Sequence, residues 1–215
     1  MTAPDLPASG GAFTPVTVTA PEGCLVNAKP PAAVAAGNVE TSSRIVDVLF
    51  AALGTAIPVP AQGQGTMNNI VLGNERFSYY ETVAGGQGAC PHADGPSAVH
   101  VAMTNTFNTP VEALELAYPL RVERYAVRTG SGGAGAHRGG DGVIREVRVL
   151  EPCSLSVLAQ RRAQAPRGAA GGADGRRGRT RVNGEELPAV ASRELRTGDV
   201  IGVETPGGGG YGRLC

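Results

Sequence analysis

The chain has 215 residues, which is enough for one large domain or two small ones and for a sizeable buried core. Its formal net charge is zero, so the overall charge does not favour nucleic acid or an anionic membrane as a partner. No stretch approaches the ~20 apolar residues of a membrane-spanning helix. Aromatic residues make up only 4% and tryptophan is absent, so the core must be built from valine, leucine, isoleucine and alanine.

The cysteines are widely separated and form no Cys-x-x-Cys pair; they are Cys24, Cys90, Cys153 and Cys215. This spacing fits neither a zinc site nor a disulfide framework. The amino terminus has neither the basic start nor the apolar run of a signal peptide. Reduced thiols and a cytoplasmic location are therefore expected.

The amino-terminal part of the sequence predicts a flexible segment followed by short strands. Residues 1–12 are small and polar with two prolines, which indicates a flexible terminus. Residues 15–20 are rich in β-branched side chains and predict a strand, and residues 25–26 predict a second short one.

The clearest helical pattern lies at about residues 40–53. Apolar residues recur there at the spacing of one helix face, at Ile45, Val48, Leu49, Ala52 and Leu53. Asn38 or Thr41 is expected to cap the start of this helix, and Gly54 suits the position after its end. We expect the apolar stripe to pack on a sheet; a partner-binding face is the alternative.

Strands and a second helix are predicted next. Residues 67–72 and 77–83 predict two strands joined at Gly73-Asn74, and residues 98–103 alternate cleanly, with His100 among alanines on one face. A short helix is expected at about residues 110–117.

The start of that second helix matches a capping box, with Thr109 as N-cap, Pro110 as the first helical residue and Glu112 at the third position. Glu112 therefore has a sufficient structural role. A catalytic role for Glu112 or Glu115 needs support from outside this pattern.

The second half of the sequence predicts mainly strands, at residues 120–128, 143–150, 155–158 and 200–205. Val182-Asn-Gly-Glu185 predicts a tight hairpin turn, and Thr197-Gly-Asp199 predicts another turn. The expected fold class is α+β and predominantly β, with one main helix and glycine-rich loops between the strands.

Three glycine-rich stretches separate these elements, at residues 85–95, 130–142 and 206–212. Glycine permits positive φ and close backbone approach, and successive exposed amides can form a nest for an anion. The alternative is a set of tight turns that let layers of the fold approach one another. Candidate substrate-binding or anion-binding residues within these stretches are Gly85, Gly86, Gly88, Asp94, Gly133, Gly135, Arg138, Gly139 and Gly140.

Within this set, Arg138 is the predicted side-chain donor to an anion, with His137 as a further donor beside the loop, and either Asp94 or Asp141 could orient an arginine. His92 and Asp94 are weak candidates for metal ligands, because a lone histidine beside a glycine loop is more often a hydrogen-bonding loop residue. No other metal ligands are predicted, and no catalytic residue is assigned.

Several common sites are excluded. No Gly-x-Ser-x-Gly elbow exists, and the 132–139 stretch lacks the lysine of a phosphate-binding P-loop. The 130–135 stretch fits a dinucleotide-binding pattern in part, but a strand rather than a helix is predicted after it. An arginine-glycine RNA-binding protein is a further alternative, suggested by Gly175-Arg-Arg-Gly-Arg179, although aromatic residues are scarce and the net charge is zero.

Taken in order, several motifs resemble the hydantoinase B and 5-oxoprolinase B-type family, to which subunits of acetone and acetophenone carboxylases are related. Each motif is weak alone, but their order over residues ~12–212 is specific. They are Pro21-Glu-Gly-Cys-Leu-Val-Asn27, Gly85-Gly-Gln-Gly-Ala89 with Asp94-Gly95, Asn105 with Asn108-Thr-Pro-Val-Glu112, Glu115-Leu-Ala-Tyr-Pro119, Gly132-Gly-Ala-Gly135 with Arg138-Gly-Gly140, and Thr205-Pro-Gly-Gly-Gly-Gly-Tyr-Gly212. The resemblance adds Asn105 and Glu112 to the candidate substrate-binding or anion-binding residues.

The resemblance covers only the carboxy-terminal part of the family's chain, as a domain over residues 13–212 with sub-lobes at 13–117 and 118–212. The family's His/Asp-rich metal-binding stretch lies in the amino-terminal part, which has no match here. Ala165-Pro-Arg-Gly168 also stands where the family usually has an aromatic residue after the proline.

The resemblance implies a segment of an ATP-dependent enzyme that hydrolyses a cyclic amide such as a hydantoin or 5-oxoproline. An A-type partner would bind ATP and Mg²⁺ and phosphorylate the substrate oxygen, and this chain would bind no cofactor directly. An amino-terminal B-type chain or segment would be the other partner and could carry a metal. The alternative is a non-catalytic structural or assembly subunit, and the isolated chain is expected to be inactive and to expose apolar surface.

Overall fold

The structure, a computed structural model, describes residue 11 and residues 14–214. The chain divides into two units, Met1–Gly37 and Asn38–Cys215, which are described separately. Apart from Gly11, the predicted flexible segment 1–12 lies outside the described residues.

The described residues of the first unit form turns and extended chain rather than a sheet. The strand predicted at residues 15–20 is wrong: Val16 and Val18 are 57% and 85% exposed and pair with no other strand in residues 14–37. The strand predicted at residues 25–26 is also wrong. Those residues form the tip of a tight turn that is closed by a bridge between Cys24 and Asn27.

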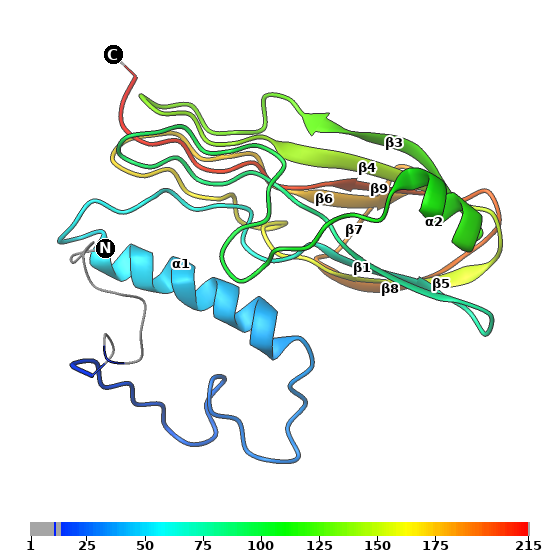
Figure 1. The fold of residues 1–215 in the computed structure, drawn as a ribbon, viewed down its shortest axis with the longest axis horizontal. Helices are drawn as coiled ribbons and strands as arrows, with labels where there is room; N and C mark the ends of the chain where they lie inside the picture. Colours follow the sequence, from blue (N-terminus) through cyan, green and yellow to red (C-terminus); the bar gives the residue numbers. More distant parts are fainter. Residues whose placement is uncertain (1–10, 12–13, 215) are drawn as a thin grey trace. The chain divides into compact units, whose positions relative to one another are not determined.

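The second unit contains two antiparallel sheets within its described residues (Figure 1). The four-stranded sheet has the order β2 (Ser78–Thr82), β1 (Asn69–Gly73), β5 (Cys153–Leu158) and β8 (Val190–Leu195). The five-stranded sheet has the order β3 (Leu120–Arg128), β4 (Gly142–Val149), β9 (Val200–Glu204), β6 (Arg179–Val182) and β7 (Glu185–Leu187).

The two sheets bury a common apolar core between them. Along β5 every second residue is buried, as the period of a half-buried strand requires. Leu72 and Leu155 from one sheet and Ile201 from the other are at most 2% exposed and belong to one cluster. The predominantly β fold predicted from the sequence is confirmed.

Local sequence signals identified most strands correctly. The predicted strand at residues 120–128 coincides with β3, and the predicted turn at Asn183-Gly184 joins β6 to β7 with φ of 51° and 88°. The sequence pattern did not predict β8. It also predicted a strand at residues 98–103 that does not form, because Ala98 and Ala102 adopt positive φ and only Val99 makes a bridge, to Gly85.

The predicted sub-lobes at 13–117 and 118–212 share a sheet. β1 precedes residue 118 and β5 follows it, yet the two strands pair directly along their full length, from Asn69 opposite Leu158 to Gly73 opposite Ser154.

The main helix forms where the sequence predicted it, but with the opposite face buried. A π-helical turn η2 (Gly37–Thr41) leads into α1 (Ser42–Leu53). Val48 and Leu49 of the predicted buried stripe are 64% and 56% exposed, whereas Ser43 is buried. Gly54 continues the helix with φ −62° rather than turning left-handed, and its amide donates to the carbonyl of Phe50.

The second helix, α2 (Val111–Ala117), confirms the short helix predicted at this position. Its predicted capping box is wrong. Pro110 is the N-cap and no side chain caps the helix start, so Thr109 and Glu112 do not exchange hydrogen bonds with its amides. Among the described residues, neither helix is long and apolar enough to cross a membrane.

Candidate functional site

The three glycine-rich stretches are not separate surface loops. Together with two further segments they form a bundle of extended chains that lie side by side beyond the ends of the strands (Figure 1). We call this the glycine bundle; it comprises residues 60–66, 84–89, 131–141, 166–176 and 205–211.

The segment 207–210 lies in the middle of this bundle and is fully buried. Successive amides donate in different directions: Gly208 to the carbonyl of Gly140 at 2.8 Å, Gly209 to that of Gln62 at 2.8 Å and Gly210 to that of Ala173 at 2.9 Å. Bonds that point to several neighbours in turn are typical of an extended helix with three residues per turn and no internal hydrogen bonds.

Close backbone approach explains the glycines. A Cβ added to Gly208 would lie 1.9 Å from the carbonyl oxygen of Gln87, and one added to Gly139 would lie 2.0 Å from that of Gly208. Any side chain at these positions would force neighbouring backbones apart. The glycines therefore replace side-chain packing with backbone packing.

Five of the predicted glycines have amides that are already paired within this packing. The Gly86 amide donates to the Pro206 carbonyl, and the amides of Gly133 and Gly140 donate to carbonyls of the bundle at 2.8 and 2.9 Å. The amides of Gly85 and Gly139 donate to Val99 and Gly133. An anion could reach these five amides only by replacing those hydrogen bonds. None of the five is therefore a free donor, and their role in anion binding stays a prediction.

Arg138 lies at the edge of the bundle in a defined orientation. Its guanidinium group donates to both carboxylate oxygens of Asp141, at 2.8 and 3.1 Å, and its side chain is 49% exposed. Asp141 also accepts the Gly132 amide at 2.7 Å. The prediction that Asp141 could orient the arginine is confirmed.

Asp94 lies beside the same arginine but contacts its backbone. The carboxylate accepts the Arg138 amide at 2.8 Å and lies 3.5 Å from Nδ1 of His137. Asp94, Arg138, Asp141 and His137 therefore form one polar cluster at the end of the bundle, which is the part of the predicted site that the structure brings together.

The remaining candidates lie apart from that cluster or only line the bundle. Asn105, Glu112 and His92 are exposed, and within the described chain none makes a hydrogen bond or ion pair with it. Gly88 and Gly135 belong to the bundle, where added Cβ atoms would lie 1.9 and 2.7 Å from backbone oxygens. No grouping of three metal-ligating side chains occurs among the described residues.

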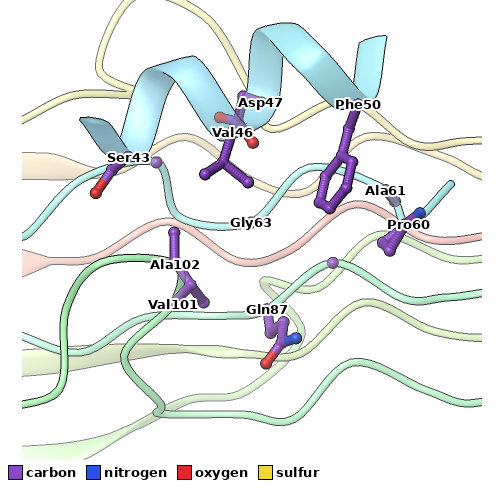
Figure 2. A pocket seen from close by; sticks show the side chains of 12 residues that line it. Ser43, Val46, Asp47, Phe50, Pro60, Ala61, Gly63, Gln87, Val101 and Ala102 are labelled. Atoms are coloured by element: carbon purple, nitrogen blue, oxygen red, sulfur yellow. The ribbon is translucent and has the colours of Figure 1, made fainter. Parts of the chain in front are cut away.

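A cleft of about 310 Å³ lies between α1 and the glycine bundle (Figure 2). Val46 and Phe50 of α1 point into it, and Pro60, Ala61 and Val101 face them. The volume falls at the lower end of the range for small-molecule sites, and most of the wall is apolar.

Asp47 provides the charge of this cleft. Its carboxylate accepts from Arg161 at 2.7 Å and also pairs with Arg44 one turn earlier on α1. Burial raises the pKa of Asp47, and the two arginines oppose this rise. The pKa of Arg161 is lowered, chiefly by burial and then by Arg44, while Asp47 acts in the opposite direction.

Ser43 and Gln87 supply the other polar groups of the cleft. The Ser43 hydroxyl is buried and has no hydrogen-bond partner in the described structure, and the Gln87 side chain is exposed along the wall. The arrangement can hold a small, mainly apolar molecule with a few polar contacts. The sequence did not predict this cleft, because Asp47 and Arg161 are 114 positions apart.

A second cluster of polar side chains lies inside the β-sandwich. Arg145 is fully buried, donates to Glu81 at 2.7 Å and lies 4.8 Å from the centre of the Tyr125 ring. Asn108 joins Glu81 to the Tyr125 hydroxyl. Burial raises the pKa of the neighbouring Tyr79 to about 12, and the charge of Glu81 adds to this rise.

Comparison with known proteins accounts for nearly the whole chain. The Hydantoinase B/oxoprolinase family matches residues 1–214. An uncharacterised protein of Methanocaldococcus jannaschii is 45% identical over 215 residues, a match that covers 97% of this chain and 38% of that protein. A 5-oxoprolinase of Dictyostelium discoideum is 41% identical over 214 residues, covering 97% of this chain and 17% of that protein.

A solved structure agrees with these matches. The ATP-dependent caprolactamase from Pseudomonas jessenii is similar with a TM-score of 0.78 and 28% identity, over 91% of this chain and 38% of that chain. The present chain thus spans less than two fifths of the length of each of these relatives. The match over residues 1–214 places it plainly: the chain belongs to the hydantoinase B/oxoprolinase family.

Proposed function

We propose that this chain is the carboxy-terminal B-type segment of an ATP-dependent enzyme that hydrolyses a cyclic amide, such as a hydantoin, 5-oxoproline or a similar lactam. The observation that carries the proposal is the match of almost the full chain to a 5-oxoprolinase, together with its structural similarity to an ATP-dependent caprolactamase.

In this proposal an A-type partner binds ATP and Mg²⁺ and phosphorylates the amide oxygen. Phosphorylation turns that oxygen into a leaving group and makes the carbon electrophilic. A site that receives such an intermediate must exclude water and provide donors for negative charge. The closely packed, hydrogen-bonded glycine bundle and the oriented guanidinium group of Arg138 are the features of this chain that suit that role.

The other groups of the active site are proposed to come from an amino-terminal B-type chain or segment, including any metal ligands. The exposed face of α1 is the proposed contact for it. Val48, Leu49 and Leu53 are 64%, 56% and 44% exposed on that face, and the relatives carry chain beyond the matched part that could cover them.

The same exposed face favours a second candidate, a non-catalytic structural or assembly subunit of a hydantoinase or acetone-carboxylase-like complex. In that case the chain would hold other subunits together without contacting substrate.

Reconstitution separates the two candidates. The purified chain is mixed with an A-type chain and an amino-terminal B-type fragment, and ATP-dependent hydrolysis of hydantoin and 5-oxoproline is measured. Hydrolysis that requires this chain supports the catalytic segment. Unchanged turnover without it contradicts that role and favours assembly.

Arg138→Lys is the matched variant for the site, because lysine keeps the charge but loses the two-pronged contact with Asp141. We expect turnover to fall about tenfold, which corresponds to 1.36 kcal/mol, while ATP hydrolysis persists. Gly133→Ala would not be a useful second variant for this test. Its Cβ would lie 2.1 Å from the Ala173 carbonyl oxygen and would disturb the fold itself.

A further inference from the structure

A second cavity lies where β3 and β9 end beside the arginine-rich segment before β6. Its volume is about 440 Å³ and four arginines line it, Arg128, Arg176, Arg177 and Arg179, with Glu204 as the one carboxylate of the wall. None of these residues belongs to the cleft under α1 or to the Arg138 cluster.

The carboxylate of this cavity is already shared. Glu204 pairs through one oxygen with Arg128 at 2.8 Å and through the other with Arg181, which lies outside the cavity, at 2.6 Å. Glu204 therefore brings a single negative charge against the four arginines of this cavity and Arg181 beside it.

Few carboxylates neutralise the other three arginines of the cavity. Arg179 lies 4.0 Å from Glu186, at the limit of an ion pair, and both side chains are about half exposed. Arg176 and Arg177 contact no carboxylate among the described residues, and Arg177 donates only to backbone carbonyls. The cavity therefore has a surplus of positive charge.

One guanidinium group, that of Arg128, is held in place before any ligand arrives. Arg128 is 11% exposed and donates to the carbonyls of Arg177 at 2.8 Å and Thr205 at 3.1 Å. The pKa of Arg128 is lowered by burial first, while Glu204 opposes this and Arg179 and Arg176 add to it. The arginines thus repel one another, a cost that a bound anion would remove.

The chemistry of the wall limits the ligand. Guanidinium groups match the oxygens of a phosphate in pairs, with two parallel hydrogen bonds. The rest of the wall is Ala165 and Gly175, so no aromatic ring is present to stack on a nucleobase. The complement is a compact, multiply charged oxyanion.

We propose that this cavity binds phosphate, either free or as the phosphoryl group of a small molecule. The inference does not depend on the proposed hydrolase activity, because it rests only on the charges and geometry of this wall.

Calorimetric titration of the full chain tests it, with inorganic phosphate and pyrophosphate as probes in chloride buffer at constant ionic strength. We expect saturable one-to-one binding, with pyrophosphate tighter if a phosphoryl group of a larger molecule is the natural ligand. The variant Arg176→Ala/Arg179→Ala should weaken binding at least tenfold. Neither side chain donates a hydrogen bond within the described structure, so the fold should persist, as an unchanged melting temperature would show.

Arg124→Ala is the matched control, since Arg124 is an exposed arginine of β3 outside the cavity and its loss should leave the affinity unchanged. Absence of saturable binding, or equal weakening by Arg124→Ala, overturns the proposal. Tighter binding of a single-stranded RNA than of pyrophosphate, with a steep dependence on salt, would also overturn it and indicate a nucleic-acid surface instead.

Discussion

The β-sandwich and the glycine bundle are two solutions to the same packing problem within one unit. In the sandwich, alternate side chains of each strand meet in a core in which Leu72, Leu155 and Ile201 are nearly inaccessible. In the bundle, backbones lie so close that no side chain fits between them, as at Gly208, where a Cβ would lie 1.9 Å from a neighbouring oxygen.

The difference lies in what stabilises each region. The sandwich gains from removing apolar side chains from water, an effect that tolerates modest changes of shape. The bundle buries few apolar side chains, and it depends on backbone hydrogen bonds such as that from Gly209 to Gln62 at 2.8 Å. Because a buried amide or carbonyl without a partner is costly, the bundle must be complete to be stable.

The largest expected effect follows at the centre of the bundle. Gly208→Ala places a methyl group against the Gln87 carbonyl and must break several backbone hydrogen bonds. We expect the free energy of unfolding to fall by more than about 4 kcal/mol, a range reserved for severe disruptions. Urea unfolding followed by circular dichroism measures this.

Gly202→Ala is the matched control, since Gly202 lies in β9 and its Cβ would meet only Glu146 Cγ at 3.9 Å. The free energy of unfolding should change by no more than about 0.5 kcal/mol. If the two variants unfold alike, close backbone packing does not explain the glycines.

Sequence patterns did not predict the bundle as a packed unit. Glycine-rich stretches in loops and in a packed bundle have the same composition, and periodicity of apolar residues does not operate where side chains are absent. By contrast, β3 and the Asn183-Gly184 turn were predicted because each depends on neighbouring residues alone. The pairing of β1 with β5 depends on residues far apart in the chain.

The sandwich should show the tolerance that the bundle lacks. Leu155 is fully buried in β5. Leu155→Ala removes buried methyl groups and leaves a cavity, which should cost roughly 2–5 kcal/mol of unfolding free energy. Leu155→Met keeps the volume and should cost less than about 1.5 kcal/mol. Equally severe losses for both variants, in the same urea assay, would contradict this contrast.

The candidate site was predictable only in part, for a related reason. Arg138 and Asp141 are three residues apart and their contact was anticipated, whereas Asp47 reaches Arg161 only through the tertiary fold. For α1 the apolar stripe was recognised. Such a pattern predicts that one helix face is buried, but it does not identify whether a sheet of the same chain or another chain buries it.

The exposed face of α1 should therefore matter for association and not for the fold of this chain. Val48→Ser/Leu49→Ser alters side chains that are 64% and 56% exposed, so unfolding free energy should change by no more than about 0.5 kcal/mol per residue. Binding to an amino-terminal B-type fragment, measured by calorimetry, should weaken tenfold or more.

Leu116→Ser on α2 is the control for that measurement, because Leu116 is also an exposed apolar helix residue, at 89%. Its loss should leave the affinity for the fragment unchanged. Equal effects of both variants would mean that general surface hydrophobicity, and not α1, drives the association.

The smallest expected effect is a pH dependence where α1 meets the bundle. Burial raises the pKa of Asp47 above its ordinary value of 3.8, despite Arg161 and Arg44. As pH rises, the Asp47 carboxyl group therefore loses its proton in the unfolded chain before it does so in the folded chain. The contribution of Asp47 to the free energy of unfolding is present below about pH 3.8, and it is lost as pH rises through the higher folded-state pKa.

Asp47→Asn lacks this titration, so the wild-type chain should lose stability relative to the variant across that interval. Urea unfolding of both proteins between about pH 3 and pH 6 measures the difference, in which the other carboxyl groups cancel. A wild-type chain that gains stability relative to Asp47→Asn with rising pH would show that the two ion pairs outweigh burial, and that the middle of α1 is fixed by charge rather than by its contact with the glycine backbones.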